Sequence, residues 1–529
     1  MQQPSCSYQN HARALHAATF LLVLLFVLIQ LVRSRENASE IIDFDPLVPV
    51  LRPQQQKATL APVDAAAYLG ALGEKHGLTR NVSLFSRRVR AAPEVSERRS
   101  MTDVQQVFSD AEWESVRLDD EKMPLSAGGD VSLPVAKITK PGDVDASDLL
   151  FGMVTTYNRL SHANDSLVRS WRQWLTDGRG SANGASVVIA LYNTTTREAW
   201  ATHDKLQDAG IDATVLTLNN DLDPVSRYFE VLDILLEVSK ALAEDVHAKK
   251  YIGVVEDDIF FPTLGQLLSK LSKFDAQDPY YIGVPSERPD WTVKDDVAIT
   301  HGGGAVFLTP PAAVTISNLP CYSSDSPPFA NTTTWDAVLH ECVSKHTKMP
   351  LHVLSSFYSP RDALYNMQAH TYDLGVSPLA LRHTESRHQI DASRAHFVAA
   401  ACGEACFLQR FRFADDWVLV NGYSLTHYCA GFEVVPMSSR AALQGAMQYG
   451  LEAELPVSDG IILDETDAKK EIVTWRGTRY VWSFLDAVAG NDGEVWQVYA
   501  RKGGGPLFGE DEEEGGGELD SVIVLIWEH

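Results

Sequence analysis

Three consecutive carboxylates, Glu256, Asp257 and Asp258, directly follow a short apolar run at residues 251–255. Such a run is typical of a parallel strand that is buried on both faces of an α/β sheet. Ligands of these sheets bind beyond the carboxyl ends of the strands. Carboxylates at that place could hold a hard divalent cation, which prefers oxygen ligands and often shares them with substrate phosphates. An acidic corner with solvated charges is an equally good interpretation of these residues alone.

The elements that would position these carboxylates alternate between strand and helix. We expect strands at residues 149–156, 186–192, 213–218, 251–255 and 280–284, and helices at residues 166–175, 196–209, 228–247 and 264–274. This alternation predicts βαβ units, and therefore an α/β domain with a mostly parallel, Rossmann-like sheet. We place this domain at residues 148–405.

Three later features could complete a site at the same edge of the sheet. Gly303 and Gly304 belong to a glycine turn before a strand at residues 306–308, where the backbone could approach a ligand closely. A simple tight turn explains these glycines equally well. Asp336 lies in the first turn of an expected helix, and His383 ends an expected short strand at residues 379–383.

The pattern changes after Cys406. Segments that resemble antiparallel strands follow one another at residues 411–420, 471–475, 479–485, 494–501 and 521–527. Their apolar and β-branched residues are bounded by turn residues, which is typical of β-structure. We therefore expect a β-rich C-terminal region at residues 406–529.

The net charge argues against two classes of partner. The 529 residues include 45 basic and 70 acidic side chains, for a formal charge of −25. Nucleic acids and anionic membrane surfaces both attract basic patches, so neither is expected to be the main partner. The hydrophobic content of 45% is ordinary for a globular protein and allows a sizeable core.

An apolar segment near the N-terminus predicts a membrane anchor. Residues 15–32 would form a helix of roughly 27 Å, just enough for a thin bilayer. No small-residue cleavage site follows, which argues against a removed signal peptide. Five glycosylation sequons follow the segment, at Asn37, Asn81, Asn164, Asn193 and Asn331. We therefore predict a type II protein with a cytosolic tail at residues 1–14, one span at 15–32, a stem at 33–147 and a lumenal body.

The cysteines agree with an oxidising compartment. Five of the six follow the apolar segment, as expected for disulfides in a lumen. We predict a Cys321–Cys342 disulfide, which would hold the helix of Asp336 in place. We also predict one pair among Cys402, Cys406 and Cys429, without choosing which.

A set of ordered motifs resembles a known enzyme family. The motifs are FGMVTTYNRL, VRSWRQWL, YIGVVEDDIFFP, YIGVPSERPDW, HGGGAVFLTP, WDAVLHEC and CFLQRFRFADDWVLVNGYS, and they span residues 151–424. Together they resemble the fungal branch of glycosyltransferase family 31, the fringe-like β-1,3-glycosyltransferases. The resemblance implies a GT-A fold, a type II Golgi anchor, a UDP-sugar donor, a glycan acceptor on a glycoprotein or glycolipid, inversion at the anomeric carbon, and Mn²⁺ bound by a D-x-D-type motif.

Two departures from the family pattern concern the acceptor side. The family usually has a GGAG-type turn, whereas this chain has Gly302-Gly303-Gly304-Ala305 after His301. A glycine- and acid-rich segment commonly precedes the helix that follows Cys321, and here residues 331–335 (NTTTW) replace it. The identity of the acceptor therefore stays open.

The resemblance also implies a role for each candidate residue. Asp258 would be the first ligand of Mn²⁺ or another divalent cation, with Asp257 next and His383 completing the metal shell. A surface histidine with no role is an equally good interpretation of His383. Departure of a nucleoside diphosphate develops negative charge, which a divalent cation stabilises. Asp336 occupies the position of the family's general base, although an acidic residue also favours a helix N-terminus for electrostatic reasons alone. The donor nucleotide would be bound by Thr155, Thr156, Arg159, Glu256, Asp257, Gly303 and Gly304.

Two other functions compete with a glycosyltransferase. A lumenal metal-dependent phosphoesterase could use the same carboxylates, but two-metal enzymes need a second cluster of His and Asp. Only His383 and His388 are candidates for such a cluster. The third possibility is a non-catalytic carbohydrate-binding or scaffold protein whose β-rich end is the functional part.

Overall fold

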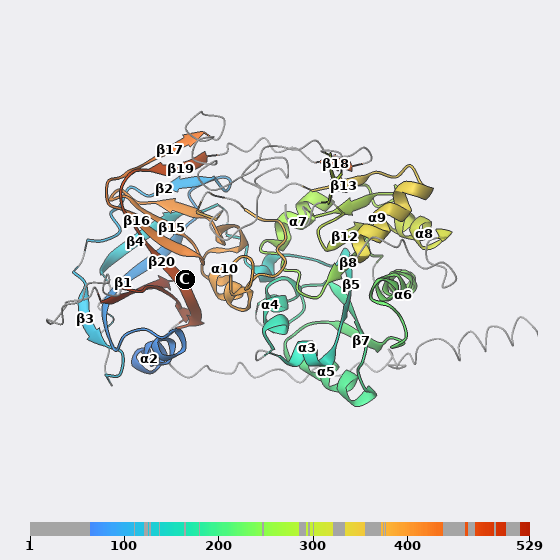
Figure 1. Cartoon of the computed structure of the whole chain (residues 1–529), viewed down its shortest axis with the longest axis horizontal. Coiled ribbons are helices and arrows are strands. Elements are labelled where there is room, and N and C mark those ends of the chain that lie inside the picture. The colour runs from blue at the N-terminus through green and yellow to red at the C-terminus, as the bar shows by residue number, and fades with distance from the viewer. Residues whose placement is uncertain are drawn as a thin grey trace, which may run out of the picture.

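The structure of the chain is a computed structural model (Figure 1). The structure describes residues 64–110, 112–120, 125, 128–136, 138–162, 165–178, 180–245, 248–284, 292–294, 297–299, 301–320, 334–354, 372–373, 375, 377–436, 461–463, 471–490, 493–503 and 519–528. The predicted anchor at residues 15–32 lies outside these ranges. Among the helices that the structure does describe, none has the length and apolar character needed to span a bilayer.

One half of the protein is built on a mostly parallel sheet. Within the described residues it has eight strands, in the order β18-β13-β9-β12-β8-β5-β6-β7. Only β12 runs antiparallel to its neighbours. The strands are β5 (Leu149–Thr155), β6 (Ser186–Leu191), β7 (Ala213–Thr217), β8 (Tyr251–Glu256), β9 (Tyr281–Gly283), β12 (Ala305–Leu308), β13 (Leu351–Val353) and β18 (Ile461–Leu463). The predicted α/β fold is therefore confirmed.

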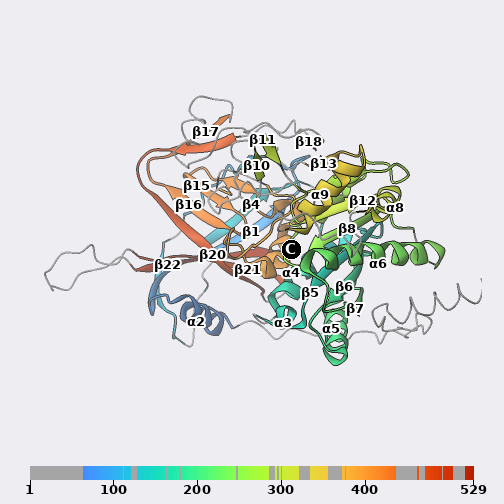
Figure 2. The same ribbon diagram turned by 45° about the vertical axis from the view of Figure 1, so that its right-hand side comes forward.

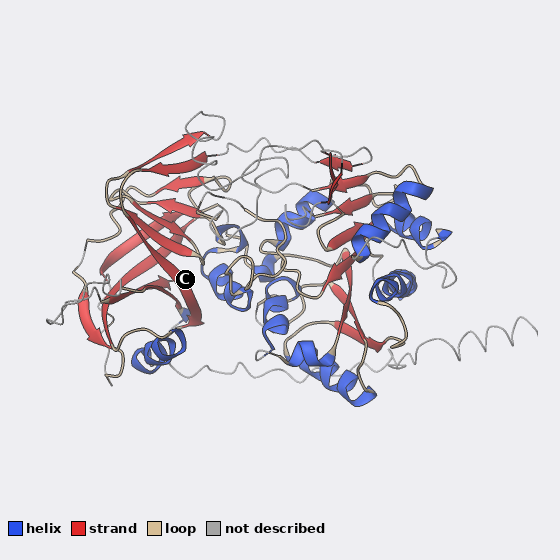
Figure 3. Cartoon of the chain, viewed as in Figure 1, coloured by secondary structure: helices blue, strands red, loops and turns tan. Residues whose placement is uncertain are grey.

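Helices cover both faces of this sheet (Figure 3). Every residue of β5 is buried, and alternate side chains point to opposite faces, as the two-residue period of a strand requires. Phe151 and Met153 pack with helices on one face, and Leu150 and Val154 pack with helices on the other. The first face carries α4 (Ser166–Leu175), α5 (Thr196–Asp208) and α7 (Leu264–Leu271), and the second carries α6 (Pro224–Asp245), α8 (Pro310–Ser317) and α9 (Trp335–His346).

The other half is a β-rich layer that lies on the opposite side of the molecule (Figure 1). In the described part of the chain its main sheet has ten strands, with the path β2-β14-β15-β16-β20-β21-β22-β1-β3 and β4 beside β1. The strands are β1 (Asn81–Ala92), β2 (Met101–Asp103), β3 (Glu114–Arg117), β4 (Gly128–Pro134), β14 (Arg410–Arg412), β15 (Trp417–Val420), β16 (Ser424–Tyr428), β20 (Arg479–Ala489), β21 (Val495–Arg501) and β22 (Asp520–Glu528). The predicted β-rich C-terminal region is thus present.

Residues 65–134 correct the predicted stem. The described residues of this range form helix α2 (Ala65–His76) and strands β1 to β4, and so belong to the folded body rather than to a spacer. The first strand, β1, pairs in parallel with the last strand, β22 (Figure 2). The prediction was wrong because β1 and β2 pair with distant strands, β1 with β22 and β2 with β14, which no local pattern reveals. Conversely, β18 comes from the predicted C-terminal region but joins the α/β sheet.

Smaller elements connect or extend the two halves. Helix α10 (Ala395–Cys402) packs against α4 on one side and against β20 and β21 on the other. Further helices and 3₁₀ turns among the described residues are α3 (Tyr157–Ser161), η1 (Pro141–Asp143), η6 (Ala392–Arg394) and η7 (Glu404–Cys406). Two small antiparallel pairs are β10 (Thr292–Lys294) with β11 (Val297–Ile299), and β17 (Phe432–Pro436) with β19 (Glu471–Trp475).

The cysteines agree in part with the expectation. Cys402 and Cys406 form a disulfide at the end of α10, which confirms one pair among the three late cysteines. Cys429 is free and exposed. Cys342 is disulfide-bonded, but Cys321, its predicted partner, lies outside the described residues. The Cys321–Cys342 pairing therefore stays a prediction.

Candidate active site

The three carboxylates lie where the sequence placed them, at the carboxyl end of a central strand. Strand β8 has β5 on one side and β12 on the other, and it ends at Glu256. A hydrogen bond from the amide of Ile259 to the carbonyl of Glu256, at 3.2 Å, closes the turn that follows. The side chains of Glu256, Asp257 and Asp258 are only 15%, 10% and 14% exposed. The charges are therefore held in place by protein groups rather than solvated.

Asp257 is bound by groups from the neighbouring strand β5 and the helix after it. Its Oδ2 accepts hydrogen bonds from Thr155 Oγ1 and Arg159 Nε, both at 2.6 Å. Thr156 caps α3 by accepting the amide N–H of Arg159 at 3.2 Å, so the helix begins there and directs Arg159 back toward the carboxylate. Burial raises the pKa of Asp257, and the charge of Arg159 and the Thr155 hydroxyl oppose that effect.

Asp258 and His383 contact each other directly. The Nδ1 of His383 lies 2.9 Å from Asp258 Oδ2, and Arg159 Nη2 lies 3.6 Å from the same oxygen. Burial works against ionisation of Asp258, but the hydrogen bond from His383 and the nearby positive charges outweigh it and lower the pKa of Asp258. The same hydrogen bond raises the pKa of His383. His383 adopts φ 53°, in the left-handed region, within a turn rather than at the end of the expected strand. Only a single bridge between Phe260 and Leu381 forms there.

Glu256 is engaged by two side chains that the sequence analysis did not single out. Arg382 Nη2 lies 2.5 Å from Glu256 Oε2, and Trp335 Nε1 donates to Glu256 Oε1 at 3.2 Å. The Trp335 ring in turn stacks on Tyr228, with centroids 4.6 Å apart. Burial raises the pKa of Glu256 to about 7, against the opposing charge of Arg382. Arg382 stands next to His383 and Trp335 next to Asp336, so adjacency to a candidate was the only available signal for them.

The glycine turn brings Asp336 to the same edge of the sheet. Gly302, Gly303 and Gly304 all have positive φ, at 104°, 66° and 75°, which explains why residues without a side chain occupy the turn. The carbonyl of Gly304 accepts from the amide of Glu256 at 2.9 Å, and its own amide donates to Asp336 Oδ2 at 3.3 Å. Asp336 Oδ1 accepts the amide N–H of Ala337 at 2.9 Å. Asp336, in the first turn of α9, is therefore coupled to the end of β8.

The residues proposed to hold a divalent cation fit that role in type. Asp258, Asp257 and His383 offer carboxylate oxygens and one imidazole nitrogen, a donor set that suits Mn²⁺. Asp258 and His383 are already within 2.9 Å of each other. Among the described residues, however, no group of three or more His, Cys, Asp or Glu side chains is arranged as a metal site. In this arrangement Asp257 Oδ2 is committed to Thr155 and Arg159.

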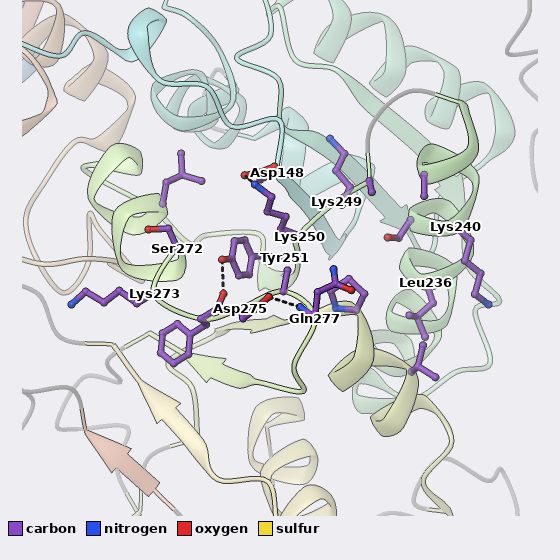
Figure 4. Close-up of a pocket in the computed structure, with 18 of the residues that line it drawn as sticks. Asp148, Leu236, Lys240, Lys249, Lys250, Tyr251, Ser272, Lys273, Asp275 and Gln277 are labelled. Carbon is purple, nitrogen blue, oxygen red and sulfur yellow. Dashed lines mark hydrogen bonds and ion pairs between the residues drawn. The ribbon is translucent and has the colours of Figure 1, made fainter.

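A small cavity of about 240 Å³ adjoins Asp258 and His383. A larger one, of about 1130 Å³, lies at the opposite edge of the sheet, at the amino ends of β5 and β8 (Figure 4). The lysines there are largely engaged by the protein: Lys250 pairs with Asp148 at 2.8 Å, and Lys249 donates to the carbonyl of Ser147 at 2.7 Å. The larger cavity lacks the carboxylate cluster, so we take the smaller one, beside Asp258, as part of the active site.

Comparisons with known proteins add little to this geometry. No model of a protein family matches the chain, and no curated protein matches it. Among solved structures, the glycosyltransferase GlyE of Streptococcus pneumoniae TIGR4 is 12% identical over 44% of this chain and 54% of its own, with a TM-score of 0.29. The chain thus spans about half the length of the first structures it matches.

Two further matches are also named as sugar transferases. The mannosyltransferase PcManGT of Pyrobaculum calidifontis, determined with GDP-Man and Mn²⁺, is 11% identical over 33% of this chain and 47% of its own, with a TM-score of 0.22. A glycosyltransferase involved in glycosylation of the major capsid of PBCV-1 is 12% identical over 46% and 98%, with a TM-score of 0.25. Similarity at this level carries no argument about activity, so the function must be inferred from the residues of the site.

Proposed function

We propose that the chain is a glycosyltransferase that moves a sugar from a UDP-sugar to a glycan hydroxyl, with Mn²⁺ or another divalent cation as cofactor. One observation carries the proposal. At the carboxyl end of β8, Asp258 lies beside His383 and next to Asp257 in the chain, and a three-glycine turn joins that strand end to the buried carboxylate of Asp336. Ligand sites of parallel α/β sheets are found at this edge.

In this proposal the cation side of the site consists of Asp258, His383 and Asp257. A bound divalent cation would act as a Lewis acid that stabilises the charge developing on the leaving diphosphate. Asp258 remains ionised because His383, Arg382 and Arg159 lower its pKa, and an ionised carboxylate is the form that binds metal. Arg159 is half-exposed beside both aspartates, where its guanidinium could also contact a phosphate.

On the acceptor side of the site, Asp336 would act as the general base. A general base must take the proton of the attacking hydroxyl, and Asp336 is the buried carboxylate that the glycine turn holds near the end of β8. Thr155, Gly303 and Gly304 would line the donor site, with Thr155 holding Asp257 in position. Thr156 would contribute by capping the helix that carries Arg159. Inversion and a β-1,3 linkage follow only from the resemblance to glycosyltransferase family 31.

One observation disfavours a phosphoesterase. A two-metal site would need His388 as part of a second ligand cluster, but this residue is fully buried and its Nδ1 lies 2.8 Å from Tyr372 Oη. His388 is therefore committed to the interior. We also propose the topology implied by the sequence: a Golgi membrane protein of type II, with residues 15–32 as its span, the body in the lumen, and the acceptor glycan on a glycoprotein or glycolipid.

A donor screen tests the proposal directly. The detergent-solubilised full-length protein is incubated with individual UDP-sugars, and with GDP-mannose for comparison, in the presence of Mn²⁺, and release of the nucleoside diphosphate is measured. We expect release from at least one UDP-sugar, loss of release on adding EDTA, and loss in Asp258→Asn. Absence of release and of nucleotide binding for every donor would contradict the proposal.

A further inference from the structure

The β-rich layer contains a second cavity, remote from the proposed active site. Its volume is about 600 Å³, and its aromatic wall comes from consecutive strands of the sheet: Trp417 on β15, His427 on β16, and Tyr480 and Trp482 on β20. Trp113, just before β3, completes the wall. None of its lining residues lines the cavity beside Asp258. Figure 1 shows β15, β16 and β20 in the β-rich layer, away from β8.

The rings of this cavity are held in place by one another. Trp417 and Trp482 are only 4% and 5% exposed, whereas Trp113, His427 and Tyr480 are partly exposed. Each buried tryptophan supports a partly exposed ring: Trp113 stacks on Trp482 at 5.8 Å, and His427 stacks on Trp417 at 4.8 Å. Rings that are fixed before a ligand arrives lose little conformational freedom when it binds.

Polar groups surround these rings. The guanidinium of Arg501 lies 4.3 Å from the centre of the Tyr480 ring. Ser83 and Ser521 stand opposite each other on β1 and β22, and Ser521 Oγ accepts the indole N–H of Trp482 at 2.8 Å. Asp415 is fixed at the edge, because its carboxylate accepts the amide N–H groups of Phe108 and Ser109 at 2.8 and 2.9 Å. The cavity thus combines flat apolar faces with a few oriented donors and acceptors.

We propose that this cavity is a non-catalytic saccharide-binding site. A pyranose has apolar C–H faces that can pack on aromatic rings, and its hydroxyls need donors and acceptors in fixed positions, which is the combination that this cavity offers. A phosphate or nucleotide is disfavoured, because the single arginine among the lining residues is accompanied by the carboxylate of Asp415. The volume suits a short oligosaccharide, since typical small-ligand pockets measure roughly 300–1,000 Å³.

This site does not depend on the transferase assignment. If the chain is a glycosyltransferase, the β-rich layer would retain a glycan that carries the acceptor, and so raise its concentration near the catalytic half. If the transferase proposal fails, the cavity still predicts glycan binding. The transferase proposal and the saccharide-binding proposal can therefore fail independently. The Asp258→Asn variant, altered only in the proposed active site, distinguishes them, because it should lose transferase activity and keep saccharide binding.

Calorimetric titration of the full-length protein with mannobiose, lactose and chitobiose, preceded by a screen of immobilised N- and O-linked glycans, tests the site. We expect binding of at least one saccharide, undiminished in Asp258→Asn. Trp113→Ala should weaken it about tenfold or more, the scale found for central aromatic anchors. The matched control is Trp200→Ala, which removes a tryptophan that is 43% exposed on α5 in the other half.

A second variant guards against misfolding of the first. Trp113→Phe keeps an aromatic ring on Trp482 and should recover a substantial part of the affinity, while the near-UV circular dichroism and melting temperature of all variants are compared with those of the wild type. Failure to bind any glycan on the array, or equal binding by Trp113→Ala and the wild type, would overturn the proposal. Loss of binding in Trp200→Ala would overturn the assignment to this cavity.

Discussion

Gly304 joins Asp336 to the end of the strand that carries the candidate metal ligands. Its amide donates to Asp336 Oδ2 at 3.3 Å, and its carbonyl accepts from the amide of Glu256 at 2.9 Å. A single residue thus connects the proposed base in the first turn of α9 with the carboxylates after β8. A displacement of Gly304 should therefore alter the positions of both Asp336 and the carboxylates after β8.

We expect Gly304→Ala to impair transfer through this connection. A Cβ there would lie 2.8 Å from Arg382 Cδ and 3.1 Å from Glu256 Cδ, at a backbone φ of +75°. Backbone strain at such a site costs on the order of 1–3 kcal/mol. The control is Gly178→Ala, which has a similar φ of +73° but no neighbouring atom within 4 Å of the added carbon. Denaturant unfolding should show destabilisation by backbone strain in both variants and a further loss from the close contacts in Gly304→Ala, and only Gly304→Ala should lose most of the activity. Equal activities would disprove the connection.

Replacing Asp258 should impair the binding of metal and donor, whereas replacing Asp336 should impair the transfer step. Asp258→Asn should weaken the binding of both Mn²⁺ and the UDP-sugar, because the cation holds the diphosphate in the proposed site. Asp336→Asn should leave donor binding almost intact and lower the transfer rate by about 10²–10⁴-fold, the usual value of general-base catalysis. Calorimetry with UDP and Mn²⁺ separates the two. If Asp336→Asn abolished nucleotide binding as completely as Asp258→Asn, Asp336 would not be the base.

Glu404 should make the stability of the protein depend on pH. Its carboxylate is buried and accepts the amide N–H of Gly265 at 3.0 Å, and burial raises its pKa to about 7. Above the unfolded pKa of 4.5 the folded state therefore binds more protons than the unfolded state, so this residue lowers the free energy of unfolding as the pH rises from 4.5 to about 7.

Replacement by a neutral isostere should remove this contribution. Glu404→Gln keeps an acceptor for Gly265, and its free energy of unfolding, relative to the wild type, should rise between pH 4.5 and pH 7.5 by up to about 3 kcal/mol. Urea unfolding at both pH values measures the difference, and the same substitution at an exposed glutamate, Glu94→Gln, is the matched control. A relative stability that is constant across this range would refute the prediction.

The cysteines should react according to their environments. Native protein treated with iodoacetamide should be modified at Cys429, which is free and exposed, and unmodified at Cys402 and Cys406. Non-reducing peptide mapping should recover the Cys402–Cys406 peptide, and we further predict a Cys321–Cys342 peptide. Detection of Cys321 as a free thiol would exclude the latter pairing.

The sequence was informative where a local pattern determines the structure. The buried run before Glu256 has the composition of a parallel strand, so the position of the three carboxylates at its end could be predicted. Residues 411–420 show the limit of such patterns. They were expected to form one strand, but a turn containing Asp416, at φ 60°, divides them into β14 and β15. Strand β14 has Arg410 and Arg412 on either side of Phe411, whereas β15 is apolar, and only the turn chemistry between them marks the break.

Contacts between distant segments were beyond local patterns. Tyr228, on α6, stacks on Trp335 of α9, and Arg382 pairs with Glu256, although more than a hundred residues separate each pair. Their positions depend on how helices and loops pack around the sheet, which the spacing of residues in one segment does not specify. The partners that fix the electrostatics of the site were therefore visible only in three dimensions.

The parallel pairing of β1 with β22 has a consequence for biosynthesis. The amide of Thr79, just before β1, donates to Asp520, which is 441 residues later in the chain. At typical synthesis rates of 5–20 residues per second, roughly 20–90 s pass between their emergence from the ribosome. During that time β3 and β4 can pair with one edge of β1, but the edge that pairs with β22 stays open, and an open strand edge is prone to aggregation. The nascent chain should therefore depend on chaperones until β22 has emerged, and deletion of β22 should harm folding far more than its length suggests.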